Sequence, residues 1–101
     1  MLLVRLSDAA KADLRAIHRF DVQTFGVRRS DAYLVALRAT INMLGEFPQT
    51  GAIRAGMAEG IRVRPSGSHI IVYAVDDKTV RILRVRHTSE DWTSRPTGDR
   101  P

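Results

Sequence analysis

The sequence has 101 residues, 44% of them hydrophobic and 27% charged, which predicts one globular domain over residues 1–92 and a tail over 93–101. It has no cysteine, which excludes a disulfide framework and a thiolate zinc site. It also has no signal-peptide pattern and no run of about 18 apolar residues, which favours a cytoplasmic protein. The formal net charge is +5, and the stretch from Gly60 to His87 carries six lysines and arginines against two aspartates. This excess of positive charge indicates either an anionic partner or a solvated, arginine-rich sheet face, and the sequence favours the two equally.

The N-terminal residues predict a short strand followed by a helix. Residues 2–6 are apolar apart from Arg5 and form the strand candidate. Ser7 or Asp8 can cap the helix, because their side-chain oxygens accept hydrogen bonds from the free backbone N–H groups at a helix start. Apolar residues follow at helical spacing, and Gly26 is a natural stop. These apolar residues are Ala10, Leu14 and Ile17.

A second helix follows after a short loop. Ser30 or Asp31 opens it, and Phe47–Pro48 ends it, because proline disfavours helical geometry in the residue before it. Its apolar side chains recur at intervals of three and four residues and are expected to face the core. They are Leu34, Leu37, Ile41 and Leu44. Two antiparallel helices joined in this way form a helical hairpin.

The C-terminal half predicts three strands, over residues 61–65, 69–75 and 79–87, which are rich in β-branched side chains. A turn at Ser66–Gly67 joins the first strand to the second, and a turn at Asp76–Lys78 joins the second to the third. Short turns of this kind predict an antiparallel sheet.

Side-chain alternation separates two faces of this sheet, because a slip of one residue moves every side chain to the other face. The two turns pair Pro65 with Ser68 and Val75 with Thr79. The first face is expected to lie under the helices and carries Ile61, Val63, Ile70, Val72, Ala74, Val80 and Ile82. The second face is expected to be open and carries Arg62, Arg64, His69, Ile71, Tyr73, Arg81, Leu83, Val85 and His87.

The open face would combine polar and apolar side chains. His69 lies opposite Arg64 and Val85 in this register, and His87 is a diagonal neighbour of His69 within side-chain reach. An uncovered antiparallel face is normally polar, so an exposed apolar strip favours a partner-binding surface over plain solvation. The strip consists of Ile71, Tyr73, Leu83 and Val85.

Several stretches resemble ParE toxins, in order and at the spacings of that family. They are Leu6–Leu14 (LSDAAKADL), Glu46–Gly51 (EFPQTG), Gly60–Arg62 (GIR), His69–Tyr73 (HIIVY), Ile82–His87 (ILRVRH) and Asp91–Trp92. No single tripeptide is diagnostic, but the ordered set covers roughly residues 2–92. The chain is therefore identified as a member of the ParE branch of the ParE/RelE superfamily of bacterial toxins.

The resemblance implies an α+β fold, with an N-terminal helical hairpin packed on a small twisted, mainly antiparallel sheet. It implies a ParD-like antitoxin as partner in a hetero-oligomer and DNA gyrase as target, with no cofactor, metal, membrane or direct nucleic-acid contact. Antitoxin binding is then expected at the apolar strip of Ile71, Tyr73, Leu83 and Val85. Target binding is expected at Arg81, Arg84, Arg86, His87 and Trp92. Arg84 and Arg86 are expected to emerge beyond the helices, beside the segment 88–92.

The rival hypothesis is an enzyme, because relatives of the RelE type share this fold and cut messenger RNA on the ribosome. That reaction needs a base for the ribose 2′-hydroxyl, an acid for the leaving oxygen and cations at the phosphate. His69 and His87 could serve as the acid–base pair, and Arg62, Arg64 and Arg81 could hold the phosphate. A third hypothesis is an interaction module that still binds its antitoxin but has lost its toxicity.

Overall fold

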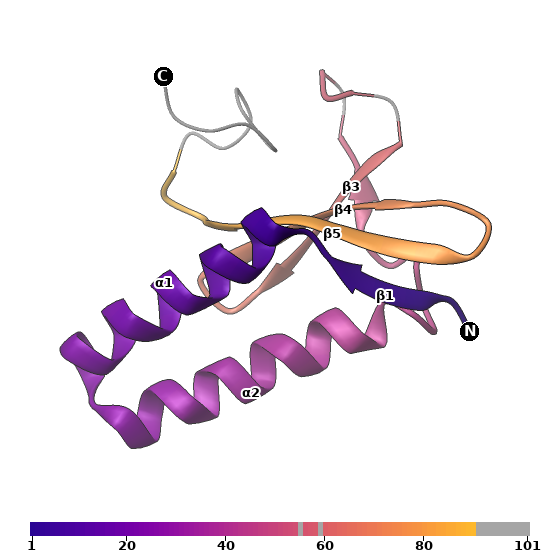
Figure 1. Ribbon diagram of the computed structural model, residues 1–101. Coiled ribbons are helices and arrows are strands. Elements are labelled where there is room, and N and C mark those ends of the chain that lie inside the picture. The colour runs from indigo at the N-terminus through magenta and orange to yellow at the C-terminus, as the bar shows by residue number, and fades with distance from the viewer. Residues whose placement is uncertain (55, 59, 91–101) are drawn as a thin grey trace.

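The structure, a computed structural model, describes residues 1–54, 56–58 and 60–90 (Figure 1). Two helices pack against one side of a five-stranded sheet whose strand order is β1-β5-β4-β3-β2. The elements in chain order are β1 (Leu3–Leu6), α1 (Asp8–Phe25), α2 (Val27–Met43), β2 (Ala52–Ile53), β3 (Ile61–Ser66), β4 (His69–Val75) and β5 (Thr79–His87). Trp92 and the predicted tail lie outside the described residues.

The sheet is mixed rather than purely antiparallel. β1 pairs in parallel with the first half of β5, from Leu3 beside Thr79 to Leu6 beside Ile82, and the other neighbouring strands are antiparallel. The predicted helical hairpin on a mainly antiparallel sheet is thus confirmed, with one strand ahead of the hairpin. The two-residue strand β2 was not predicted.

The start of α1 is as the sequence predicts. Ser7 Oγ accepts a hydrogen bond from the backbone N–H of Ala10 at 2.9 Å and donates its own proton to the carbonyl of Leu83 at 2.8 Å. One hydroxyl therefore caps the helix and attaches it to β5. The helix ends at Gly26, whose φ of +85° lies in the region that favours glycine.

The predicted bounds of the second helix are wrong at both ends. α2 begins at Val27, directly after Gly26, so no loop separates the two helices. Ser30 lies inside the first turn, where its hydroxyl donates to the Gly26 carbonyl at 2.7 Å. The helix stops well before the predicted proline, because the chain there turns towards β1. The Gly45 carbonyl accepts a hydrogen bond from the Leu2 N–H at 2.9 Å, and a side chain on Gly45 would clash with the Leu2 carbonyl.

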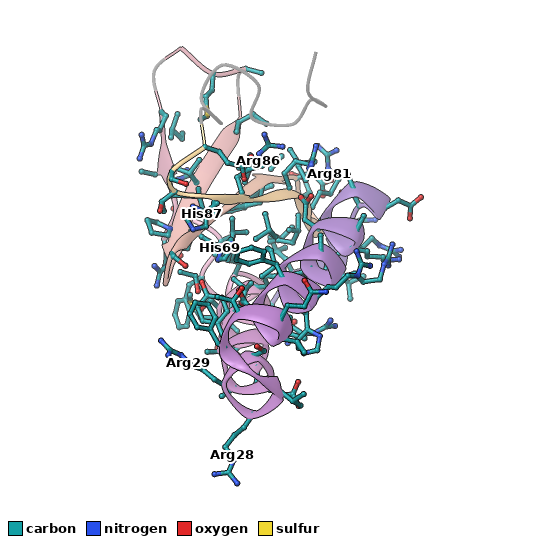
Figure 2. All side chains as sticks on the ribbon, turned by 90° about the vertical axis from the view of Figure 1, so that its left-hand side faces the viewer. Arg28, Arg29, His69, Arg81, Arg86 and His87 are labelled. Carbon is teal, nitrogen blue, oxygen red and sulfur yellow. The ribbon has the colours of Figure 1, made fainter. Side chains whose placement is uncertain are left out.

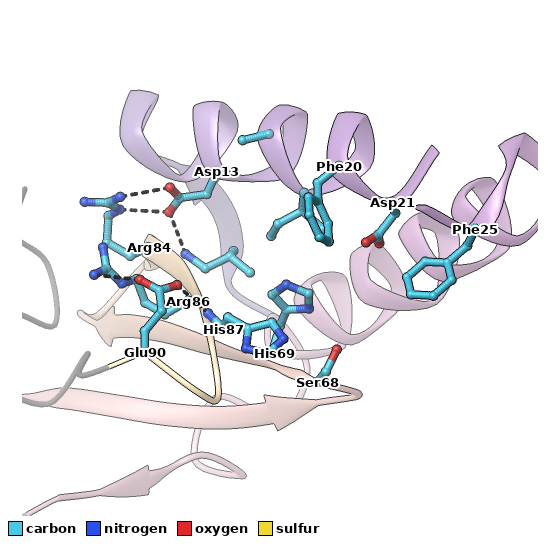
Figure 3. Close-up of a pocket in the computed structure, with 13 residues that line it drawn as sticks. Asp13, Phe20, Asp21, Phe25, Ser68, His69, Arg84, Arg86, His87 and Glu90 are labelled. Atoms are coloured by element: carbon cyan, nitrogen blue, oxygen red, sulfur yellow. Dashed lines mark hydrogen bonds and ion pairs between the residues drawn. The ribbon is translucent and has the colours of Figure 1, made fainter. Parts of the chain in front are cut away.

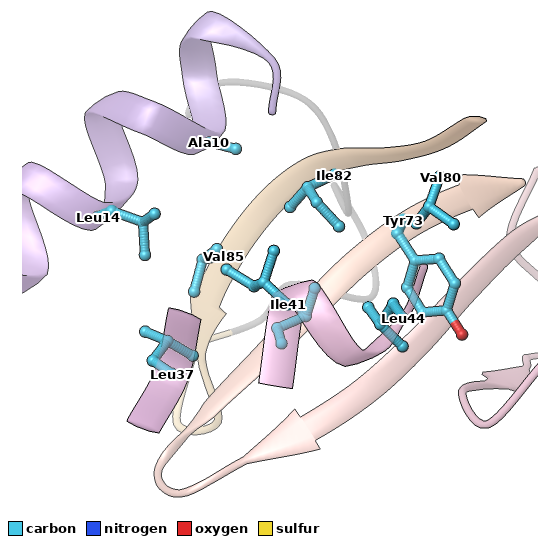
Figure 4. Packing of buried hydrophobic residues seen from close by; sticks show 10 residues of the cluster. Ala10, Leu14, Leu37, Ile41, Leu44, Tyr73, Val80, Ile82 and Val85 are labelled. Carbon is cyan, nitrogen blue, oxygen red and sulfur yellow. The ribbon is translucent and has the colours of Figure 1, made fainter. Parts of the chain in front are cut away.

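The main core lies between the helices and the sheet (Figure 4). The predicted stripe of α2 supplies Leu37, Ile41 and Leu44, each at most 2% exposed, and Leu34 packs at its margin. The remaining buried members are Ala10 and Leu14 from α1, and Ile71, Tyr73, Val80, Ile82 and Val85 from the sheet. The prediction that this stripe faces the core is confirmed.

On β3 and β4 the helices cover the face opposite to the predicted one, whereas the prediction that Val80 and Ile82 of β5 lie under the helices is confirmed. Ile71, Tyr73 and Val85 are buried beneath them, so the predicted open apolar strip is wrong. A second buried cluster on the other face includes Met57 and Leu83 at its margin. Its buried members are Ile61, Val63, Ile70, Val72 and Ala74, all predicted to lie under the helices. Alternation alone could not choose between the faces, because β4 is apolar on both.

An extra residue in β5 changes which side chains share a face. Consecutive residues of β4 pair with Ile82 and Arg84, so Leu83 has no partner and forms a β-bulge. Ile82 and Val85 therefore both belong to the core under the helices, while Leu83 packs against the cluster on the other face.

A half-buried ion pair attaches α1 to β5 just after the bulge. Asp13 Oδ2 accepts hydrogen bonds from Arg84 Nε at 2.8 Å and from the Val85 backbone N–H at 2.9 Å, and Asp13 Oδ1 accepts from Arg84 Nη2 at 2.9 Å. The two side chains are only 13% and 15% exposed. The prediction that Arg84 emerges beyond the helices is therefore wrong.

We expect Arg84→Met to lower the free energy of unfolding by about 2 kcal/mol, because it leaves the half-buried Asp13 carboxylate without its counter-ion. Arg81→Met is the matched control on the same strand. Arg81 Nε and Asp76 Oδ2 are 3.9 Å apart and both side chains are 55% exposed, so this pair contributes at most about 1 kcal/mol. Urea unfolding measures both changes, and equal losses would contradict the structural weight given to the Asp13–Arg84 pair.

Candidate functional site

A cleft of about 680 Å³ opens between α1 and the paired ends of β4 and β5 (Figure 3). One helix supplies a wall of the cleft, and residues of the strands and of the turn after β5 supply the rest. The lining residues are Asp13, Ala16, Ile17, Phe20, Asp21, Phe25, Ser68, His69, Arg84, Val85, Arg86, His87 and Glu90.

His69 and His87 meet in this cleft and are called the histidine pair below. β4 and β5 pair the two residues directly, and the ring centroids lie 5.2 Å apart in an edge-to-face arrangement. The predicted proximity of the two imidazoles is confirmed, but the register is not. His69 stands opposite Ser66 and His87, rather than Arg64 and Val85. The β3–β4 turn lies one residue later than predicted, Val75 pairs with Val80 instead of Thr79, and the bulge in β5 adds a further residue.

Tyr33 of α2 fixes the ring of His69. Its hydroxyl lies 2.6 Å from His69 Nδ1, accepts a hydrogen bond from the Ser68 backbone N–H at 3.1 Å, and lies 3.3 Å from the Ser66 carbonyl. The phenol oxygen thus contacts three polar groups between Ser66 and His69, which hold the His69 ring in place. A side chain at Gly67 would clash with Tyr33, so this turn needs glycine for the close approach as well as for its φ of +58°.

The second imidazole is held by the turn that follows β5. The Ser89 backbone N–H donates to His87 Nδ1 at 3.1 Å, and the Ser89 hydroxyl lies 2.7 Å from the same nitrogen. Glu90 Oε1 accepts from the His87 backbone N–H at 2.8 Å, and Glu90 Oε2 lies 3.1 Å from Arg86 Nη2. Arg86 is buried and thus belongs to a fixed local network, contrary to its predicted exposure.

Burial lowers the pKa of His69 below its ordinary value of 6.5, and positive charge on His87 lowers it further. The carboxylates of Asp21 and Glu90 act in the opposite direction, with smaller effect. His69 is therefore uncharged at neutral pH.

The arginines predicted to hold a phosphate lie away from the histidine pair. Arg62 and Arg64 donate to backbone carbonyls at 2.8 and 2.7 Å, and neither lines the cleft. Arg81 stands opposite Ala74, on the sheet face that the helices do not cover, and Figure 2 shows it set apart from the two histidines. The predicted constellation of two histidines and three arginines is thus not assembled.

The residues predicted to bind the target are also separated. Arg84 and Arg86 are buried or half-buried in ion pairs with Asp13 and Glu90, whereas Arg81 and His87 are exposed. Trp92 lies outside the described residues. These five residues therefore do not form one basic surface in the part of the chain that the structure describes.

The sequence prediction missed the aromatic wall of the cleft and its link to α2. Phe20 and Phe25 follow Ile17 by three and eight residues, so α1 carries apolar side chains beyond the stripe that faces the core. That spacing could have predicted the aromatic wall from the sequence. The contacts of Tyr33 could not be predicted from the sequence, because its hydrogen-bond partners are 33 to 36 residues away.

A second groove, of about 540 Å³, lies between β1 and the two helices and is called the basic groove below. Its apolar side chains are Val4, Leu6, Leu14 and Leu34. Its basic side chains are Arg5, Lys11, Arg15 and Arg38, and His18 also lines it, 2.7 Å from Asp31. No carboxylate among the described residues lines this groove. It shares no lining residue with the cleft of the histidine pair.

The described residues, 1–54, 56–58 and 60–90, lack two kinds of functional element. None of their helices is long and apolar enough to cross a membrane. They also contain no group of three or more histidine, aspartate or glutamate side chains placed to hold a metal ion.

Comparison with known proteins decides the family. A sequence model described as the ParE toxin of the type II toxin–antitoxin system parDE matches residues 4–92. The chain belongs to the ParE toxin family. The resemblance read from the sequence is confirmed, and the protein is a toxin of the ParDE type of toxin–antitoxin system.

Similar proteins agree in sequence and in fold. Toxin ParE1 of Caulobacter vibrioides is 41% identical over 85 residues, which cover 84% of this chain and 88% of that protein. A chain of the chromosomal ParDE system from P. aeruginosa superposes with a TM-score of 0.76 at 22% identity, covering 86% of this chain and 96% of its own. A chain of the RelBE2 toxin–antitoxin complex from Mycobacterium tuberculosis superposes with a TM-score of 0.65 at 26% identity, covering 85% of this chain and 96% of its own.

The lowered pKa of His69 predicts a loss of stability in acid. The unfolded chain takes up a proton near pH 6.5 and the folded chain only at lower pH, so the free energy of unfolding falls as the pH drops below 6.5 towards the folded-state value. Urea unfolding from about pH 8 to about pH 5 measures this fall. His69→Gln, which does not titrate, should show a flatter profile, and an unchanged slope in that variant would refute the assignment to His69.

Proposed function

We propose that this toxin is neutralised by a ParD-like antitoxin and acts by inhibiting DNA gyrase rather than by cutting RNA. The observation that carries the proposal is the basic groove beside β1, which has the properties expected of a docking site for an acidic partner protein. The family match, whose description names the parDE toxin–antitoxin system, supports a ParD-like antitoxin, and gyrase is the target that the family resemblance implies.

The groove offers two complementary modes of recognition. Apolar side chains between β1 and the helices can receive the apolar face of an amphipathic helix, and the outer edge of β1 is open to a further strand. The surrounding positive charge favours a partner segment rich in aspartate and glutamate. An antitoxin segment that is disordered until it binds could use both modes, because each contact adds to the ordering of the next.

The charge balance of the other cleft supports protein inhibition over RNA cleavage. Three carboxylates line it, those of Asp13, Asp21 and Glu90, against the two guanidiniums of Arg84 and Arg86, both of which are ion-paired. The acidic and basic side chains of this lining sum to a net negative charge, which disfavours a phosphodiester. Cleavage would also require cations placed at the developing charge on the phosphate.

The proposed gyrase contacts are the exposed His87 and the residues that follow β5, whereas Arg81 is left out because it lies on the opposite face of the sheet. Arg86 contributes by holding Glu90 and hence that segment, and Arg84 is withdrawn from the contact surface because it pairs with Asp13. Trp92 is also proposed to contact gyrase, because the family resemblance implies this role.

Two assays on one preparation test the target. We expect the purified toxin to inhibit supercoiling by DNA gyrase and to leave ribosome-bound messenger RNA intact. His87→Ala removes one of several proposed gyrase contacts and should weaken inhibition by no more than a few-fold, whereas loss of a general acid or base would cost about a hundredfold or more in a nuclease. RNA cleavage that His87→Ala abolishes would overturn the gyrase assignment. Antitoxin binding without either activity would indicate a toxin that has lost its toxicity.

Charge reversal in the basic groove tests the antitoxin site. The double variant Arg15→Glu and Arg38→Glu should weaken binding of the antitoxin encoded beside the toxin gene by about tenfold or more, mainly through a slower association rate. The matched control, Arg19→Glu with Arg28→Glu, changes the net charge equally at exposed positions outside the groove. Binding of the wild type should weaken as salt is raised. Equal effects of the two double variants would place the antitoxin elsewhere.

A further inference from the structure

The wall that α1 contributes to the cleft of the histidine pair is aromatic and open to solvent. Phe20 is 64% exposed and Phe25 is 48% exposed, and both line the cleft rather than the core. Figure 3 shows Asp21 between them, on the same side of the helix and facing the strand ends. Large exposed aromatic side chains that border a cleft usually mark a binding site.

Asp21 is the one carboxylate of this cleft without a partner among the described residues. Asp13 and Glu90 are paired with arginines, whereas Asp21, which is half-buried, has no hydrogen bond or ion pair there. The negative charge of Asp21 nevertheless acts on His69 in the cleft. It raises the pKa of His69, although burial, which lowers this pKa, has the larger effect. A local negative charge on a chain with a net charge of +5 is the complement of a cationic ligand.

We propose that this cleft binds an arginine side chain of a partner protein, with the guanidinium held between Phe20 and Phe25 and paired with the Asp21 carboxylate. A guanidinium fits because it stacks on aromatic rings and donates parallel hydrogen bonds to a carboxylate. Phe25 already accepts such a group within the chain, since Arg29 Cζ lies 4.6 Å from the centroid of its ring. The apolar side chains beside the phenylalanines, Ala16, Ile17 and Val85, suit apolar residues that flank the arginine.

This site goes beyond the proposed antitoxin groove and does not depend on it. The two lie on different sides of α1 and have no lining residue in common. A partner can therefore occupy the cleft while the antitoxin occupies the groove.

Titration of the full-length toxin with a capped leucine–arginine–leucine peptide, followed by NMR, tests the proposal directly. We expect saturable shifts at Phe20, Asp21 and the histidine pair, and at least about tenfold weaker binding of the citrulline analogue, which has nearly the same shape but no charge. Asp21→Asn should weaken binding of the arginine peptide by a similar factor, and Phe20→Ala should weaken it several-fold. Asp77→Asn, at an exposed aspartate in the β4–β5 turn, is the matched control and should change nothing.

Equal affinity for the arginine and citrulline peptides, an unaffected Asp21→Asn variant, or no saturable binding would each overturn the proposal. Circular dichroism of the variants confirms that they are folded, which is expected because both substituted side chains lie on the helix surface. The same titration with antitoxin bound should give the same affinity, and displacement of the peptide would refute the independence of the two sites. Because the readout is direct binding, its failure leaves the gyrase and antitoxin assays unaffected.

Discussion

The β-bulge at Leu83 is the constraint on which the rest of this structure depends. Before it, β5 pairs with β1 and turns Val80 and Ile82 towards the helices. Without the extra residue, strict alternation would direct His87 to the sheet face that the helices leave uncovered. With it, Val85 joins the core under the helices and His87 comes to lie opposite His69. One inserted residue therefore decides that the cleft contains two imidazoles.

The helix α1 is fixed on both sides of this bulge and serves as a wall common to the basic groove and the cleft of the histidine pair. The Ser7 hydroxyl binds the carbonyl of Leu83, and Asp13 binds both the side chain of Arg84 and the backbone N–H of Val85. These contacts place one side of the helix on the core, a second side along the basic groove and a third along the cleft. A rigid scaffold of this kind allows two partners to be recognised independently, because neither site has to move for the other to be occupied.

Charge counted along the sequence differs from charge distributed in space. The excess of positive charge between residues 60 and 87 favoured an anionic partner as much as a solvated sheet face, yet Arg84 is paired with Asp13 of α1 and Arg86 with Glu90, four residues further along. The basic groove is instead lined by cations of the N-terminal half, which occur singly among apolar residues. Surface electrostatics follow from which side chains the fold brings together, and a Debye length of about 8 Å makes only near neighbours count.

The sequence by itself determined the family, the helical hairpin with its cap at Ser7 and its stripe from Leu34 to Leu44, and the proximity of His69 to His87. These depend on local signals, namely capping side chains, periodicity and ordered motifs, which a linear sequence carries. Only the tertiary structure decided which face of the sheet the helices cover, because β4 is apolar on both faces and pattern alone gives no preference. The same holds for the bulge at Leu83 and for the pairing of Asp13 with Arg84, which joins residues 71 positions apart. Packing between distant segments selects one of several registers that are equally consistent with alternation, and the composition of both binding surfaces follows from that selection.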